Sequence, residues 1–333
     1  MSSTPRYDVL AIGNAIVDVM SQADDAFIAR EGLTKGGMML IDADRATSLY
    51  GAMGAGQEIS GGSAANTLAG LAGLGAKCAF IGQVADDQLG EVFAHDIRAM
   101  GIDFNTAPRP GQPPTARCLI LVTPDAQRTM NTFLGASQFL PAEALDTALI
   151  ADASILYLEG YLWDPEEPRA AMRAAIAAAR NAGRKVAFTL SDAFVIDRHR
   201  QDFLDLIERG EIDILFANDN EIRSLAEVDD FEAAVAKFAP KVPLLVVTRG
   251  PDGAIALRDG ARFEVSAEPI AHIEDTTGAG DLFAAGFLAG LTRDESVETC
   301  LKMGAVAAAE IISHIGARPR VDLKALMAEK LAG

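Results

Sequence analysis

The sequence has few of the residues that build covalent or metal-bound frameworks. Among its 333 residues are three cysteines, Cys78, Cys118 and Cys300, which lie far apart and show no paired spacing. This pattern argues against a disulfide framework or a zinc cluster and suits a reducing compartment. The four histidines are scattered along the chain. We therefore expect no His-rich or Cys-rich metal site.

Positive charge and long apolar runs are also scarce. The chain carries 29 Lys and Arg against 47 Asp and Glu, a formal net charge of -18. Such a field repels polyphosphate backbones, so we expect no nucleic-acid partner. The apolar stretch 282–291 is interrupted by glycines and too short to span a bilayer, and segment 1–8 has no basic stretch followed by an apolar run. We expect no membrane span, no signal peptide and a cytoplasmic location.

Two common nucleotide-binding motifs are missing. No G-x-x-x-x-G-K-[ST] stretch occurs, which excludes a P-loop mechanism. The first apolar run ends in Gly13-Asn14-Ala15, which lacks the G-x-G-x-x-G spacing of dinucleotide-binding folds. A dinucleotide-dependent oxidoreductase is therefore disfavoured.

Short apolar runs recur along the chain and predict buried strands, at 7–13, 78–84, 154–158, 185–190, 212–217 and 244–248. Helical patterns lie between several of them. The plainest is the alanine-rich segment 168–181, with Gly183 as its C-terminal stop. This alternation predicts an α/β fold with a mostly parallel central sheet and helices on both faces.

Two stretches, 17–42 and 103–135, lack long helical periodicity. The second contains strand-like runs at 117–123 and 128–134, separated by a turn at Pro124-Asp125. We predict that these two insertions form a small β-sheet lid. Residues 1–16, 43–102 and 136–333 would form the large nucleotide-binding and catalytic domain.

The most informative segment is Asp275-Thr276-Thr277-Gly278-Ala279-Gly280-Asp281, which precedes an apolar helix. The first backbone N–H groups of a helix lack intrahelical partners and, with the helix dipole, favour an anion. A carboxylate at Asp281 beside such an anion needs a task, and accepting the proton of an attacking hydroxyl is the obvious one. The alternative is that the glycines and Asp281 only cap a helix.

Segment 275–281 resembles the C-terminal signature of the ribokinase-like (PfkB) carbohydrate kinases. Segment 60–68, followed by 74–76, resembles the N-terminal signature of the same family. The two lie more than half the chain apart and in the right order, and similarity extends from Asp8 to about Pro319. The resemblance implies a three-layer α/β/α domain with a lid, and ATP and Mg²⁺ as co-substrate and cofactor. It also implies Asp281 as catalytic base and an anion hole formed by the amides of Gly278, Ala279 and Gly280.

A sugar-binding site is expected after the first strand. Gly61 and Gly62 permit unusual backbone angles and close approach of a ligand, while Asp18 and Asn66 offer partners for a vicinal diol. The residues alone are equally consistent with a tight strand-to-helix turn and an exposed aspartate. The resemblance implies that Asn14, Asp18, Gly62 and Asn66 bind sugar hydroxyls.

Segments 128–130, 134–136, 188–191, 193–194 and 212–218 resemble those of the adenosine kinases within this family. The resemblance implies that Arg128 lies near the active site. An adenine ring would need apolar walls, although each candidate could equally be plain core. The candidates are Ile16, Met39, Phe133, Leu134 and Tyr161.

The nucleotide and its metal have candidates of their own. Asn218 and Glu221 match the family's Asn-x-x-Glu motif, which implies an action through water on the Mg²⁺ of Mg-ATP, although the pattern is also a helix cap. Segment Thr248-Arg249-Gly250 resembles the nucleotide-binding turn, with Arg249 facing ATP phosphates or solvent. Asp275 and Thr277 match ligand positions of a monovalent cation such as K⁺.

The expected function is ATP-dependent phosphorylation of the 5′-hydroxyl of adenosine to AMP. Another ribokinase-like kinase, acting on a free sugar or a different nucleoside, is the nearest alternative. A non-catalytic nucleoside-binding protein is the alternative from another class. A monomer and a homodimer are both open, because free strand edges in the lid could pair with a second subunit.

Overall fold

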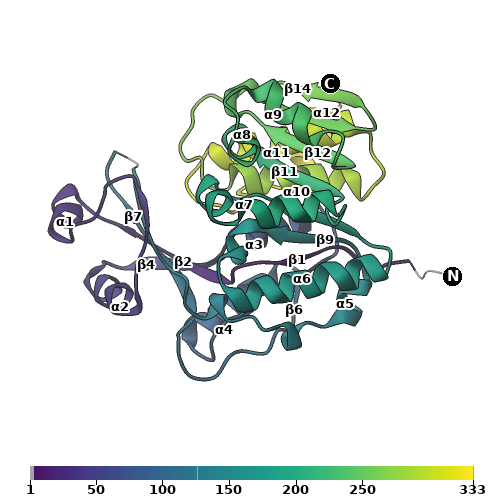
Figure 1. Ribbon diagram of the computed structural model, residues 1–333. Helices are drawn as coiled ribbons and strands as arrows, with labels where there is room; N and C mark the ends of the chain where they lie inside the picture. Colours follow the sequence, from purple (N-terminus) through teal and green to yellow (C-terminus); the bar gives the residue numbers. More distant parts are fainter. Residues whose placement is uncertain (1–3, 126, 333) are drawn as a thin grey trace.

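The computed structural model describes residues 4–125 and 127–332, which form two β-sheets and their covering helices (Figure 1). The first three residues and Gly333 belong to the predicted large domain and lie outside the described residues, as does Ala126 of the predicted lid.

The larger sheet has nine strands. In spatial order they are β14 (Ala261–Val265), β13 (Ala254–Arg258), β12 (Leu244–Thr248), β11 (Ile214–Asn218), β10 (Lys185–Thr189), β9 (Ala153–Glu159), β1 (Tyr7–Ile12), β5 (Cys78–Ile81) and β6 (Asp103–Phe104). Neighbours from β12 to β6 run parallel, whereas β13 and β14 are antiparallel additions at one edge. The predicted mostly parallel sheet is confirmed, and each of the six predicted apolar runs contributes a strand to it.

Helices cover both faces of this sheet, as Figure 1 shows. One face is covered by α3 (Ser63–Gly73), α4 (Gln88–Ala99), α10 (Ala279–Leu291), α11 (Val297–Ile312) and α12 (Leu323–Leu331). The other is covered by α5 (Thr147–Ala151), α6 (Glu166–Asn181), α7 (Ala193–Glu208), α8 (Asp219–Ala226) and α9 (Phe231–Phe238). Because alternate side chains of a strand point to opposite faces, the buried strands supply two separate hydrophobic cores.

Helix α6 shows how local sequence builds these layers. Its buried residues recur at helical spacing and form one apolar stripe against the sheet; they are Pro168, Ala171, Met172, Ala175, Ile176 and Ala179. The helix ends where Gly183 adopts a φ of +71°, a left-handed conformation that favours glycine. The predicted helix and its stop are confirmed.

The smaller sheet has five strands in the order β3 (Met38–Leu40), β8 (Arg128–Phe133), β7 (Ala116–Val122), β2 (Ile16–Gln22) and β4 (Gly56–Gly61). The predicted hairpin is confirmed as β7 and β8, which pair antiparallel. One face of the sheet packs on α1 (Asp25–Arg30) and α2 (Ala43–Ala52), whose Ile28 and Leu49 are buried with Val17, Val19 and Leu119.

The predicted lid boundaries need two corrections. Helix α2 packs on the small sheet and strand β4 pairs with β2 within it, although residues 43–61 had been assigned to the large domain. Strand β6 pairs with β5 in the large sheet, although its residues had been assigned to the lid. The polar sequence GQEISG of β4 has no apolar alternation to reveal a strand, and β6 is only two residues long.

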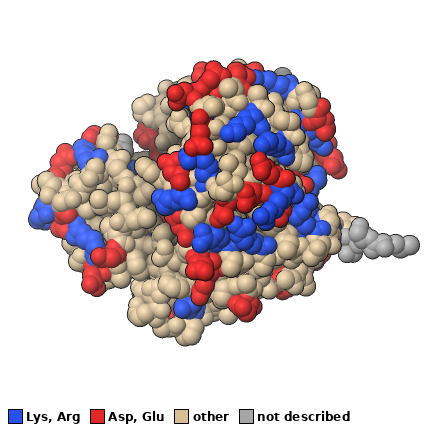
Figure 2. Space-filling view, viewed as in Figure 1, with Lys and Arg blue, Asp and Glu red and all other residues tan. Residues whose placement is uncertain are grey.

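Charged side chains of both signs alternate over α6 and α7 on the face seen in Figure 2. Ion pairs join them there, such as Arg173 with Asp202 at 2.9 Å and Arg198 with Asp164. Of the helices in the described part of the chain, none combines the length and the hydropathy needed to cross a membrane.

Candidate active site

The turn before α10 provides an unpaired set of backbone donors. Gly278 caps the helix with a φ of +80°, and the first intrahelical bond runs from the Leu282 N–H to the Gly278 carbonyl. The Ala279 N–H donates to the Thr276 carbonyl at 3.2 Å. Within residues 4–125 and 127–332, no acceptor is found for the N–H groups of Gly278, Gly280 and Asp281. These groups and the positive end of the helix dipole suit an anion.

The carboxylate of Asp281 is held beside this turn by two donors from α3. Ser63 Oγ donates to Oδ1 at 2.6 Å, and Asn66 Nδ2 donates to Oδ2 at 3.1 Å. Burial raises the pKa of Asp281 above its usual range, and these two hydrogen bonds with the charge of Arg318 offset part of that rise. A carboxylate of raised pKa in a fixed position is suited to accept a proton. The prediction that Asp281 only caps a helix therefore does not describe its contacts.

Asp18 lies across from this pair on β2. Burial raises its pKa to about 6, against the opposing charges of Arg318 and Arg128, and the charge of Asp281 raises it further. No donor among the described side chains reaches its carboxylate. Asn66 Oδ1 is also buried without a partner. Two oxygen acceptors are thus without donors at the place where the sequence predicts a diol. Because buried acceptors without partners are costly, this arrangement favours a ligand that supplies two donors.

Glycines are required where the chain passes Asp18 and Asn14. A Cβ on Gly61 would fall 2.6 Å from the Asp18 carboxylate. Gly62 has a φ of +96°, and a Cβ there would fall 2.2 Å from the Asn14 carbonyl oxygen. Any side chain at these two positions would displace the residues that flank the open acceptors.

Asn14 is buried, and it donates no hydrogen bond to the Asp18 carboxylate or to Asn66 Oδ1. Its backbone N–H and its Nδ2 both donate to Glu159 Oε1, each at 2.7 Å. The other oxygen, Oε2, accepts from the Ala64 N–H at 2.8 Å in the first turn of α3. Burial raises the pKa of Glu159 to about 7, although these hydrogen bonds lower it in part. Glu159 therefore fixes Asn14 against the start of α3.

Arg318 supplies the cation between the carboxylates. It donates to the Ser60 and Ala65 carbonyls and to Ser60 Oγ, and so joins the chain after α11 to the end of β4 and the start of α3. Burial lowers its pKa to about 10, and the charges of Asp18 and Asp281 oppose this. The guanidinium thus stays charged at neutral pH and partly balances both carboxylates.

The face of the small sheet that carries Asp18 is mostly apolar. Following the strand register, Asp18 lies opposite Cys118 and Ile59, Cys118 lies opposite Thr132, and Thr132 lies opposite Leu40. Residues opposite one another share a face. We call this set the Asp18 face; besides Asp18 and those four it contains Ile16, Met20, Met38, Ile120, Val122, Arg128 and Met130.

The register also corrects two predicted wall residues. Met39 lies opposite Asn131, and Phe133 lies opposite Arg117, so both belong to the face turned toward α1 and α2. The sequence could not give the phase of β3, whose residues are all apolar, and a shift of one position changes the face. Ile16 does lie on the Asp18 face. Tyr161, which follows β9, is 37% exposed and stays a predicted contact.

Asn218 and Glu221 form a reciprocal cap at the start of α8. The Asn218 N–H donates to Glu221 Oε2 at 2.9 Å, and the Glu221 N–H donates to Asn218 Oδ1 at 2.8 Å. Burial raises the pKa of Glu221 to about 7. A nearby divalent cation would favour the ionised form of this carboxylate. Among the described residues, however, no group of three or more His, Cys, Asp or Glu side chains is placed to hold a metal ion. The donor set fits Mg²⁺ held through water and not a protein cage.

The predicted nucleotide-binding turn Thr248-Arg249-Gly250 follows β12, and Gly250 has a φ of +56°. Arg249 is neither free nor fully solvated. It pairs with Glu264 of β14 and donates to the Asp252 carbonyl at 2.9 Å, with 19% of its side chain exposed. Contact with a phosphate would require this ion pair to be shared or opened.

Arg128 and Asp275 form a buried ion pair between β8 and the turn before α10, with 6% of each side chain exposed. The pair brings the small sheet to the anion-binding turn. The two predicted site residues are thus brought together, and the carboxylate expected to hold a monovalent cation is bound to a guanidinium.

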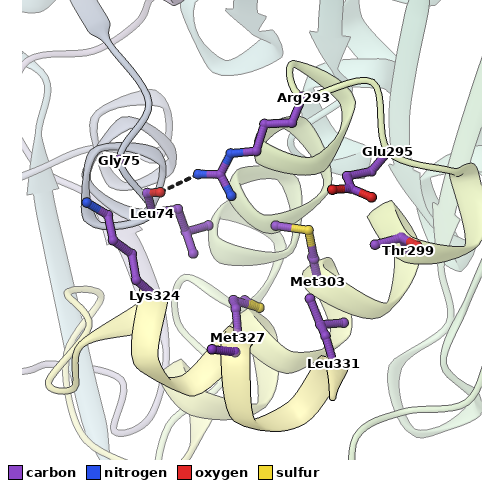
Figure 3. Close-up of a pocket in the computed structure, with 10 residues that line it drawn as sticks. Leu74, Gly75, Arg293, Glu295, Thr299, Met303, Lys324, Met327 and Leu331 are labelled. Carbon is purple, nitrogen blue, oxygen red and sulfur yellow. Dashed lines mark hydrogen bonds between the residues drawn. The ribbon is translucent and has the colours of Figure 1, made fainter. Parts of the chain in front are cut away.

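A separate hollow of about 490 Å³ lies away from these residues, between the end of α3, α11 and α12 (Figure 3). Arg293 and Lys324 line it together with the apolar side chains of Met303, Met327 and Leu331. Arg293 donates to the carbonyl of Leu74, the C-cap of α3. Cations at a helix C-terminus satisfy its last carbonyls, so the charge of Arg293 is explained by the fold.

Three residues of the site were missed from the sequence. Ser63 lies inside the quoted N-terminal segment, but its contact with Asp281 joins positions 218 apart. Glu159 had a usable signal, because it is a carboxylate directly at the C-terminal end of a buried strand, where sites form in parallel sheets. Arg318 has no local pattern that separates it from a solvated arginine.

A buried carboxylate with raised pKa, unpaired amides at a helix start and oxygen acceptors without donors are the features of a phosphotransferase that acts on a small hydroxyl compound. The chain belongs to the pfkB family of carbohydrate kinases, whose family model matches residues 33–323.

Its relatives include kinases of nucleosides and of sugars. Adenosine kinase from Sinorhizobium meliloti is 48% identical with a TM-score of 0.90, covering 98% of this chain and 100% of that one. A probable sugar kinase protein from Rhizobium etli CFN 42 matches equally, at 48% identity and a TM-score of 0.90, over 98% of this chain and 99% of that one. Adenosine kinase 2 of Arabidopsis thaliana is 25% identical, over 95% of this chain and 97% of its own length.

Proposed function

We propose that this protein transfers the γ-phosphate of ATP to the 5′-hydroxyl of adenosine and releases AMP and ADP. One observation carries the proposal. The Asp18 carboxylate and Asn66 Oδ1 accept no hydrogen bond from the described side chains, and Asp281 lies close to both, since it accepts from Asn66 Nδ2 and its charge acts on Asp18. Two hydroxyl donors on adjacent carbons would satisfy both acceptors, and a third hydroxyl farther along the ribose would then lie toward Asp281.

The Asp18 face supports a nucleoside over a free sugar. Its methionine, isoleucine and leucine side chains offer apolar surface beyond what a ribose ring alone would cover, including Met38 and Leu40, which are 53% and 62% exposed. An adenine ring would bury this surface. The 48% identity to an adenosine kinase is in keeping with this.

The chemistry follows from the contacts of Asp281. Ser63 and Asn66 orient its carboxylate, which accepts the proton of the 5′-hydroxyl as that oxygen forms its bond to the γ-phosphorus. The bond from the γ-phosphorus to the bridging oxygen of ADP breaks. The N–H groups of Gly278, Gly280 and Asp281 stabilise the charge on the transferring group. Asn218 and Glu221 would hold the Mg²⁺ of Mg-ATP through water, and the ion would supply neutralisation of the phosphate charge.

The small sheet limits the access of water. Arg128 and Ile315 join it to the large domain, the first through Asp275 and the second by packing on Cys118, Ile120 and Val122. A sheet docked in this way keeps water out of the site, so that the γ-phosphate of ATP is not transferred to water in place of the nucleoside. We therefore propose that it acts as a lid.

A substrate panel tests the proposal. Adenosine, other nucleosides, ribose and fructose are compared in an ADP-release assay, with 5′-deoxyadenosine as a ligand that lacks the acceptor hydroxyl. We expect the highest kcat/KM with adenosine, and inhibition without turnover by 5′-deoxyadenosine. A higher kcat/KM with a free sugar would assign the chain to the sugar kinases, which the Rhizobium etli relative favours. Binding of adenosine without ADP release would indicate a non-catalytic nucleoside-binding protein.

The base is tested by Asp281→Asn, with Asp259→Asn as a matched control. Asp259 is exposed in the turn between β13 and β14, and its φ of +53° suits asparagine as well as aspartate. We expect Asp281→Asn to keep its fold and lose about 10²–10⁴ in kcat, while the control is unchanged. Near wild-type turnover in Asp281→Asn would overturn the assignment.

A further inference from the structure

Asp275 uses both of its carboxylate oxygens within the protein. Oδ1 accepts from the Thr277 N–H at 3.0 Å. Oδ2 accepts from the Gly316 N–H at 3.1 Å and from Arg128 Nη1. With 6% of the Asp275 side chain exposed, little room remains for another ligand.

A cation beside Asp275 would have to share this place with the guanidinium. Two positive charges a few ångströms apart repel strongly away from bulk water, and arginine does not lose its proton in proteins. A buried carboxylate needs one counter-charge, and Arg128 already supplies it. The residues present therefore do not fit the monovalent cation that the family resemblance implied at Asp275 and Thr277.

From these contacts we infer that Arg128 takes the place of a monovalent cation and is a positioning residue for the anion-binding turn. Its charge fixes Asp275, and Asp275 holds the Thr277 N–H one residue before Gly278, the cap of α10. The unpaired amides then keep their arrangement only while β8 is docked.

The segment after α11 takes part in the same contact. Gly316 donates to Asp275, and its neighbour Ile315 packs against Cys118, Ile120 and Val122 on the Asp18 face. An ion pair and an apolar contact thus join the small sheet to the same few residues. Docking of the small sheet and ordering of the anion-binding turn become one event.

The first experiment uses the wild-type protein freed of K⁺, Na⁺ and NH₄⁺ in a tetramethylammonium buffer. KCl is then exchanged for tetramethylammonium chloride at constant ionic strength. We expect kcat/KM and Tm to be insensitive to the exchange, with less than a threefold change in kcat/KM. A K⁺-specific rise of threefold or more would overturn the inference, because Asp275 would then hold a cation despite Arg128.

The second experiment compares Arg128→Met with Arg117→Met. Arg117 lies on the neighbouring strand β7 on the opposite face, so its loss removes the same charge without touching Asp275. We expect Arg128→Met to lose about tenfold or more in kcat/KM and to gain a K⁺-specific rise in Tm and turnover, which Arg117→Met lacks. No K⁺ response in Arg128→Met would contradict the replacement. If Arg128→Met fails to fold, the wild-type comparison still decides.

The measurements of turnover rest on the proposed function, whereas the measurements of Tm do not. If adenosine is not phosphorylated at all, the proposed function fails while the response of Tm to K⁺ still tests the role of Arg128.

Discussion

Gly61 lies directly against the carboxylate of Asp18, so that a Cβ at position 61 would fall 2.6 Å from it. The backbone of Gly61 is not in the left-handed region, and alanine is tolerated there by conformation alone. Glycine is therefore required at this position by the space that the Asp18 carboxylate occupies, and not by the conformation of the strand.

Gly61→Ala is expected to displace the Asp18 carboxylate and weaken nucleoside binding. We expect KM for adenosine to rise about tenfold or more, equivalent to about 1.4 kcal/mol, with a smaller effect on KM for ATP. Steady-state kinetics measure this. Gly51→Ala is the matched control, because a Cβ at Gly51 in α2 meets nothing within 4 Å. Equal KM values in the two variants would contradict the placement of Asp18 in the site.

Gly280→Ala separates stability from turnover. A Cβ there meets nothing within 4 Å, and position 280 lies in the first turn of α10, where alanine favours the helix by up to about 1 kcal/mol. The same Cβ would occupy space beside the unpaired amides. We expect an unchanged or higher Tm with kcat/KM lower by about 10–100-fold. Retained activity with raised Tm would show that the phosphoryl group does not pass this turn.

Arg318→Met tests the electrostatics of the two carboxylates. The charge of Arg318 lowers the pKa of both Asp18 and Asp281. Its removal disfavours both anions and raises both pKa values. Because a protonated Asp281 cannot act as a base, the acid limb of the profile of kcat/KM against pH should move to higher pH.

The matched control for that shift is Arg320→Met. Arg320 is exposed, and its guanidinium donates to the Ile315 carbonyl. The control removes the same formal charge two positions away. An acid limb that moves equally in both variants would indicate a general charge effect and no specific role of Arg318.

Glu159→Gln is expected to change how stability depends on pH. The pKa of Glu159 is raised by burial from 4.5 to about 7, so the folded chain binds this proton more tightly than the unfolded chain. The stability that this contributes is fully present below about pH 4.5 and is lost as pH rises through 7. Relative to wild type, the variant should gain on the order of 1–3 kcal/mol between pH 5 and 8.

Denaturant unfolding at a series of pH values measures this difference. The variant should also raise KM for adenosine, because one oxygen that accepts from Asn14 or Ala64 becomes a donor. A constant difference in stability across the pH range would show that Glu159 stays ionised throughout.

The sheet core was readable from the sequence because buried parallel strands are continuous apolar runs. Strands β1, β5 and β9 to β12 all carry this signal. Strands β13 and β14 were not predicted. For β14 the reason is that an edge strand is largely exposed and mixes charged with apolar residues; β13 does carry an apolar run, AIALR, that could have been recognised. Strand β4 was not predicted either, because its sequence GQEISG has no strand pattern and its position is fixed by pairing with β2.

The candidate site could be predicted from the sequence only where its residues lie together in one segment. The turn from Asp275 to Asp281 is local, and its amides and carboxylate follow from a helix start. Contacts such as that of Arg318 with Ser60 join positions 258 apart, and nothing in either segment specifies the other. The Arg128 pair is intermediate: both residues were predicted in the site, but not that one neutralises the other.

Because Arg318 binds Ser60, and Ser63 binds Asp281, the reaction centre is assembled from opposite ends of the polypeptide. During synthesis on the ribosome, the amino-terminal portion emerges long before its catalytic complement. Nascent chains that stop short of Arg318 would be unable to consume ATP, whatever part of the sheet they had already folded. Turnover would thereby report translation past Arg318, and products that terminate earlier should be inactive.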